Sequence, residues 1–134
     1  MAGYSGTPLA KKLGIKENSR VRLVNAPKGF EMELGELPPG VELSGRGNKP
    51  FNLVLLFVKS ESALKKEFTK EAKRIARDGM LWVAWPKKSS GVPTDLLFDN
   101  VQKTGLNAGL VDVKICAVND IWSGLKFVYR LKDR

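Results

Sequence analysis

The segment Phe51–Val58, FNLVLLFV, constrains the fold of this chain more than any other. It is a nearly continuous apolar run of strand length. A strand with one solvated face alternates apolar and polar residues, so an unbroken run is typical of a strand covered on both faces, as in a parallel sheet. Parallel strands are joined by crossovers that are usually helical, and we therefore expect helices between the strands.

Segments of strand and helix pattern alternate along the remaining sequence. Strands are predicted over 20–25, 41–43 (weakly), 51–58, 80–85, 110–118 and 125–131, and helices over 8–14, 30–37, 61–78 and 94–104. The helix over 61–78 is expected to be the longest and to stop at Gly79, and the next to run from an N-cap at Thr94 to a break at Gly105. A proline follows Thr7 at the first helical position of the N-terminal helix, which should end near Gly14.

The alternation predicts a single domain over 1–134. Its fold class is α/β: a doubly wound, mostly parallel, Rossmann-like sheet of methyltransferase-like type. The last two strands are joined by too few residues for a parallel crossover, so they are predicted to form a C-terminal antiparallel hairpin at or near an edge. The strand over 20–25 is expected to lie centrally, because the strand order of such sheets reverses near the first strand.

The chain has no histidine and one cysteine, Cys116. The absence of histidine excludes Ser-His-Asp triads, histidine general bases and histidine-ligated metals. One cysteine excludes an intrachain disulfide and a cysteine-rich zinc site, so no metal site is predicted. Cys116 lies in an apolar strand pattern and is interpreted as a buried structural thiol.

The chain is strongly basic, with 23 Lys and Arg against 14 Asp and Glu and a formal net charge of +9. This balance favours anionic partners: a phosphate-bearing small molecule, an acidic protein or nucleic acid. No apolar run reaches the roughly 20 residues that span a bilayer, and the N-terminus lacks a secretory pattern. We therefore expect a cytoplasmic protein without a membrane partner.

Basic and hydroxyl-bearing residues gather in the loops that follow three predicted strands. Because the carboxyl ends of parallel strands share one edge of a sheet, these loops are predicted to form one anion-binding edge. Lysines there supply charge, and loop amides, hydroxyls and the helix N-terminus at Thr94 supply directed donors. The predicted ligand-binding residues are Asn25, Lys28, Gly29, Lys59, Lys87, Lys88, Ser89, Ser90 and Thr94. The alternative is that the lysines only solvate the loop ends.

Two tryptophans, Trp85 and Trp122, are candidates for stacking on a base or a partner side chain. Trp85 ends the strand that leads into the basic loop, and Trp122 is expected in the hairpin turn. Packing at strand ends is the alternative for both. Trp82, inside the strand, is interpreted as core.

A glycine-rich phosphate loop is missing, since the segment from Asn25 to Phe30 contains one glycine where a dinucleotide site uses three. No cofactor is therefore predicted from the residues. S-adenosylmethionine stays open as an alternative, because methyltransferases tolerate varied loops. A further alternative is nucleic-acid binding along a basic row, Lys66, Lys70, Lys73 and Arg77, on the longest predicted helix; the same row could be an ordinary solvated face.

Several motifs resemble the bacterial DUF3052 family, a domain of unknown function. They include Trp82–Lys88 (WVAWPKK), Trp122–Phe127 (WSGLKF), Gly3–Gly14, Leu23–Pro27 and Gly109–Lys114. The resemblance covers nearly the whole chain and implies a bacterial cytosolic protein, without implying an activity or catalytic residues.

No nucleophile is paired with a base anywhere in these motifs. The main functional prediction is therefore a non-catalytic binding or regulatory module for an anionic ligand or acidic partner. The alternatives are a reduced S-adenosylmethionine-dependent, methyltransferase-like enzyme and a nucleic-acid-binding protein.

Overall fold

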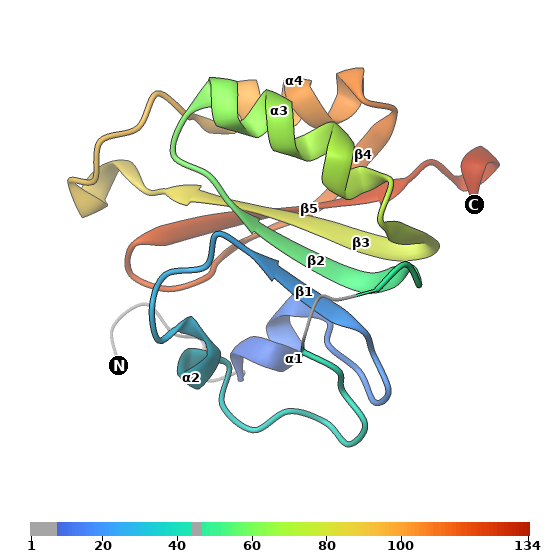
Figure 1. Ribbon diagram of the computed structural model, residues 1–134. Coiled ribbons are helices and arrows are strands. Elements are labelled where there is room, and N and C mark those ends of the chain that lie inside the picture. The colour runs from blue at the N-terminus through green and yellow to red at the C-terminus, as the bar shows by residue number, and fades with distance from the viewer. Residues whose placement is uncertain (1–7, 44–46) are drawn as a thin grey trace.

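The computed structural model describes residues 8–43 and 47–134, which contain one five-stranded sheet (Figure 1). Its strands are β1 (Val21–Val24), β2 (Phe51–Phe57), β3 (Ile75–Pro86), β4 (Leu110–Ala117) and β5 (Trp122–Tyr129), in the spatial order β1-β2-β3-β5-β4. β1, β2 and β3 are parallel, and β5 runs antiparallel to both β3 and β4. The predicted Rossmann-like α/β sheet with a C-terminal hairpin is confirmed.

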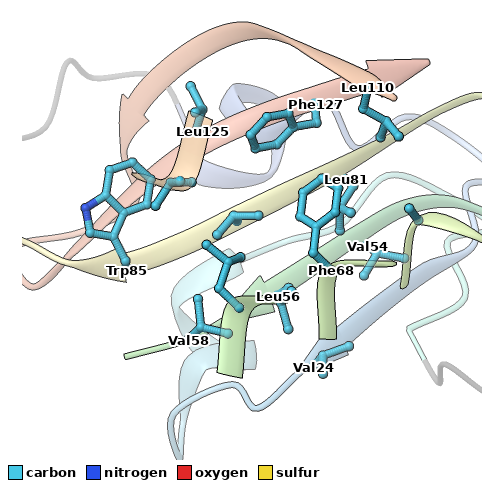
Figure 2. Close-up of a cluster of buried hydrophobic side chains, with 14 of the residues drawn as sticks. Val24, Val54, Leu56, Val58, Phe68, Leu81, Trp85, Leu110, Leu125 and Phe127 are labelled. Carbon is cyan, nitrogen blue, oxygen red and sulfur yellow. The ribbon is translucent and has the colours of Figure 1, made fainter. Parts of the chain in front are cut away.

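Helices cover both faces of the sheet. α1 (Leu9–Leu13) and α2 (Phe30–Leu34) lie on one face, and α3 (Glu61–Ala72) and α4 (Phe98–Asn107) lie on the other (Figure 1). Each face has its own hydrophobic core, and the one beneath α3 and α4 is drawn in Figure 2. In β2, Val54 and Leu56 pack into this core while Leu53 and Leu55 pack into the opposite one, all at most 1% exposed. Burial on both faces explains why this strand is apolar without alternation.

β1 is the edge strand of this sheet, so the prediction that it lies centrally is wrong. On its outer side, Glu42 forms one parallel bridge with Arg20: the amide of Val21 donates to the Glu42 carbonyl at 2.8 Å, and the amide of Glu42 donates to Ser19 at 2.9 Å. The weak strand predicted over 41–43 is thus a single bridge at the amino end of β1. Within the described residues, the carboxyl end of β1 has no neighbouring strand on that side.

α3 ends at Ala72, earlier than predicted, and Gly79 does not stop it. Ile75 continues the helical spacing of apolar residues but begins β3, where it pairs with Phe51. Gly79 lies within β3 at an irregularity in that pairing, and a Cβ there would lie 3.0 Å from three backbone carbonyl oxygens. Close approach of the backbone therefore explains this glycine.

α4 begins at Phe98 rather than at Thr94, and Gly105 lies inside it rather than at its end. The Thr94 hydroxyl donates to the Lys59 carbonyl at 2.7 Å and accepts from the Leu96 amide at 3.1 Å, so Thr94 forms a turn instead of a helix cap.

The ends of the remaining helices and strands differ less from their predicted positions. The stop of α1 at Gly14 is confirmed by a left-handed φ of 92°, whereas Thr7 lies outside the described residues. α2 is shorter than predicted, and Trp122 begins β5 instead of lying in the turn.

Candidate ligand site

The loop that follows β1 turns the chain abruptly toward α2. Asn25 and Gly29 both have left-handed backbones, with φ of 59° and 83°. Asparagine and glycine are the residues that adopt this conformation at least cost. The Asn25 amide also donates to the carbonyl of Phe57 at 3.5 Å, a long hydrogen bond that joins this loop to the end of β2.

Two adjoining cavities open at the carboxyl ends of β1 and β2, and Asn25 and Pro27 line both. The larger, about 530 Å³, is formed by Leu23, Asn25, Ala26, Pro27, Lys28, Gly29, Phe30, Glu31 and Met32. The smaller, about 350 Å³, is formed by Asn25, Pro27, Phe57, Val58, Lys59, Ser60, Ala63 and Trp122. Both volumes lie within the range of small-molecule sites.

Aromatic side chains pack beneath these cavities. The ring of Phe57 meets Phe30 edge-on at 4.9 Å between centroids and Trp122 at 5.0 Å. Trp122 is 6% exposed, and its place on β5 brings it beside the end of β2. Stacking of Trp122 on a ligand stays a prediction, with the indole now placed in a cavity wall.

The β4–β5 turn is anchored to α2. The Asn119 side-chain oxygen accepts from the amides of Ile121 and Trp122, both at 2.9 Å, and its amide nitrogen donates to Glu33 at 2.8 Å. Because Asn119 holds the start of β5 and contacts α2 at once, it positions Trp122. Sequence reasoning missed this contact, whose partners lie far apart in the chain.

The predicted basic edge divides into separate hollows. Lys28 and Lys59 line the paired cavities, whereas Lys87, Lys88 and Thr94 line another cavity of about 200 Å³ at the end of β3. Trp85 also lines this second hollow, but it is 5% exposed and packs into the core of Figure 2.

Both serines of the basic loop belong to a 3-10 turn over Lys88–Ser90. The Ser90 hydroxyl donates to the Lys87 carbonyl at 2.6 Å and accepts from the Val92 amide at 3.2 Å, while Ser89 is exposed. Ser90 therefore shapes the loop through bonds within the protein.

The prediction that a helix N-terminus at Thr94 supplies hydrogen-bond donors to a ligand is wrong, because α4 begins at Phe98. The nearby helix start is that of α3, and the protein's own side chains already cap it. Asp95 accepts from the Glu61 amide at 2.8 Å, and the Ser60 hydroxyl accepts from the Ala63 amide at 3.2 Å. Asp95 is thus a negative charge at the N-terminus of α3, to which it does not itself belong.

The prediction that four basic residues form a continuous row on one helix is also wrong, because α3 ends at Ala72. Lys66 and Lys70 lie on α3, whereas Lys73 follows its end and Arg77 belongs to β3. The Arg77 guanidinium lies over the Tyr129 ring at 4.9 Å and donates to the Asp133 carbonyl at 3.3 Å.

Cys116 is half-buried in β4, and this burial raises the pKa of its thiol, with smaller opposing effects from Lys12 and Lys114. A raised pKa leaves less thiolate at pH 8 than in an unfolded chain. We expect iodoacetamide to alkylate Cys116 several-fold more slowly at pH 8 in the folded protein than in urea, as measured by mass spectrometry. Equal rates would contradict a protected thiol.

The described residues contain no group of three or more Cys, Asp or Glu side chains placed to hold a metal ion. None of their helices is both long and apolar enough to span a membrane.

The fold matches solved structures that include methyltransferases. A SAM-dependent methyltransferase from Aquifex aeolicus aligns with 89% of this chain and 86% of its own, at a TM-score of 0.58 and 17% identity. A precorrin-6y C5,15-methyltransferase from Geobacter metallireducens aligns with 91% of this chain and 86% of its own, at a TM-score of 0.63 and 8% identity. Fibrillarin from Aeropyrum pernix was solved with bound S-adenosyl-L-methionine. It aligns with 90% of this chain and 73% of its own, at a TM-score of 0.58 and 12% identity. At these identities the matches establish a shared fold.

No protein family and no curated protein matches the sequence, so the resemblance to the DUF3052 family stays a prediction. Binding of a phosphate-bearing small molecule or an acidic protein also stays a prediction. The sequence-based prediction leaned against an enzyme, and these matches overturn that leaning, because the fold is shared with a SAM-dependent methyltransferase and with a precorrin-6y methyltransferase.

Proposed function

We propose that this chain binds S-adenosylmethionine at the paired cavities beside Asn25 and acts as a small methyltransferase. The observation that carries the proposal is the position of these cavities. They lie at the carboxyl ends of parallel strands, where open α/β sheets bind ligands, in a fold shared with structures solved with this cofactor bound.

The residues that line the cavities fit the chemical groups of S-adenosylmethionine. Lys28 and Lys59 offer cations for its carboxylate, and Glu31 offers an anion for its ammonium. Pro27, Phe57 and Trp122 provide apolar and aromatic surface for its adenine and its sulfonium. When bound, the cofactor supplies an electrophilic methyl group.

The single glycine of the β1 loop is compatible with this role. A Cβ built on Gly29 meets nothing within 4 Å, so the backbone is open to the larger cavity at this point. Asn25 supplies the second left-handed residue that a glycine would otherwise supply. The loop thus has two left-handed positions, one filled by glycine and one by asparagine.

Isothermal titration calorimetry with S-adenosylmethionine tests the proposal. Replacing Lys59 with glutamine removes one charge-assisted hydrogen bond and should weaken binding about tenfold. Replacing Asn25 with glycine keeps the left-handed backbone while removing the amide, so it separates the side chain from the turn. Lys66→Gln, on the exposed face of α3, is the matched control and should bind as the parent does.

Absence of saturable binding at about 1 mM ligand would refute the proposal. Binding that Lys59→Gln and Asn25→Gly both leave unchanged would place the cofactor elsewhere. Release of S-adenosylhomocysteine during incubation with candidate acceptors then tests methyl transfer separately from binding.

A further inference from the structure

Four lysines gather on the face of the sheet that carries α1, away from the paired cavities. Lys12 belongs to α1, Lys16 follows it, Lys114 lies on β4 and Lys126 lies on β5. Lys114 and Lys126 are directly opposite each other in the β4–β5 pairing, and Lys126 is in turn opposite Trp82 on β3. We refer to these four residues as the α1-side lysine cluster.

Hydrogen bonds join two members of the cluster, Lys12 and Lys114, and tie α1 to the sheet beside Lys126. The Lys114 amine donates to the Lys12 carbonyl at 3.4 Å, and the Lys12 amine donates to the Ala117 carbonyl at 2.9 Å. The Trp82 indole, which shares a face with Lys126, donates to the carbonyl of Leu13 at the end of α1 at 2.8 Å. The cluster therefore surrounds the junction between α1 and the β4–β5 hairpin.

The cluster carries positive charge that carboxylates do not balance. Among the described residues, none of its four amines forms a salt bridge. Lys114 and Lys126 are like charges at directly opposed positions, an arrangement that destabilises a sheet. The pKa of Lys126 is lowered by its burial first and then by the charges of Lys114 and Lys16. A bound anion would relieve the repulsion between these amines.

The shape of this region favours an extended anion. Lys114 is exposed on β4, so this side of the hairpin is accessible from solvent at that position. The four lysines come from separate segments; Lys16 and Lys114 are exposed, whereas Lys12 and Lys126 are half-buried. Phosphates spaced along a chain can meet such amines one by one, and the net charge of +9 adds long-range attraction.

We propose that the α1-side lysine cluster binds the phosphate backbone of nucleic acid. This site differs from the basic row considered from the sequence, since it lies on the opposite face of the sheet from α3. It does not depend on the cofactor proposal, because none of its four lysines lines the paired cavities.

Fluorescence anisotropy with a labelled DNA duplex, titrated at several salt concentrations, tests the proposal. Each lost phosphate contact reduces the slope of log affinity against log salt by about 0.9. Lys114→Gln/Lys126→Gln should therefore lower the slope by about 1.8 and weaken binding on the order of tenfold at about 0.1 M salt. Lys16 is exposed and lies outside the strands, so Lys16→Gln should lower the slope by about 0.9 without disturbing the sheet.

The matched control is Lys66→Gln/Lys70→Gln on α3, which removes the same formal charge from the opposite face. It should leave the slope unchanged. Equal weakening by both double variants would show that binding follows net charge alone and would overturn the proposal. So would failure to bind the duplex at about 50 mM salt, or binding of anionic lipid vesicles in its place. Thermal unfolding establishes that each variant is folded, and Lys16→Gln decides the outcome if the double variant is not.

Discussion

Replacing Arg22 with methionine is expected to lower the free energy of unfolding by about 3 kcal/mol, at the lower end of the range for broken buried ion pairs. Arg22 on β1 holds Glu71 of α3 through two hydrogen bonds, of 2.9 and 3.3 Å. The Glu71 side chain is 0% exposed, whereas that of Arg22 is 22% exposed. The substitution leaves a buried carboxylate without its cation, and water reaching the Arg22 side moderates the loss. Urea unfolding followed by circular dichroism measures it.

Two further variants show whether the lost ion pair is the cause. Arg22→Met/Glu71→Leu removes both charges and should recover most of the lost stability, because no buried charge remains. Lys65→Met breaks the exposed pair with Glu61, which is separated by 4.0 Å, and should change stability by about 0.5 kcal/mol or less. If Lys65→Met costs as much as Arg22→Met, burial of Glu71 is not what makes the Arg22 pair important.

The strands could be predicted because burial determines their composition directly. The run Phe51–Val58 is apolar since both of its faces are covered, and the terminal hairpin follows from the short connection before Trp122. Predicted helix ends were wrong where they rested on glycine, because glycine occurs both at helix ends and where two parts of a protein pack closely. Gly79 and Gly105 both suggested helix ends, but each is a point where another part of the protein comes too close for a side chain.

The candidate site could be predicted in part, because its loop is formed by neighbouring residues whereas its wall depends on how distant strands pair. Asn25 and Gly29 mark a left-handed turn that is visible in the sequence as a short loop after a strand. The wall made by Phe57 and Trp122 depends on β5 pairing beside β3, which local patterns do not specify. The position of β1 at the edge likewise depends on the neighbouring segment, of which residues 35–43 and 47–50 are described and contribute a single bridge, at Glu42.

Replacing Gly105 with alanine is expected to destabilise the protein by about 2–3 kcal/mol, the upper part of the range for overpacked cores. A Cβ at this position of α4 would lie 2.6 Å from Cζ of Phe127 and closer to two other atoms of that ring. Phe127 is 0% exposed and meets Phe68 edge-on at 5.1 Å, so its ring cannot move without displacing α3. The gain in helix propensity from glycine to alanine, about 1 kcal/mol, is too small to offset the collision.

Thermal and urea unfolding of a double-mutant cycle separate these two contributions. Phe127→Leu alone should cost about 1 kcal/mol or more by loss of packing, whereas in the Gly105→Ala background it should cost less, because the smaller side chain makes room for the new methyl group. Lys103→Ala, at an exposed position of the same helix, reports on propensity alone and should be nearly neutral. Should Gly105→Ala prove more stable than the parent, α4 must be able to move away from β5, and the close contact between Gly105 and Phe127 is not what holds the helix in place.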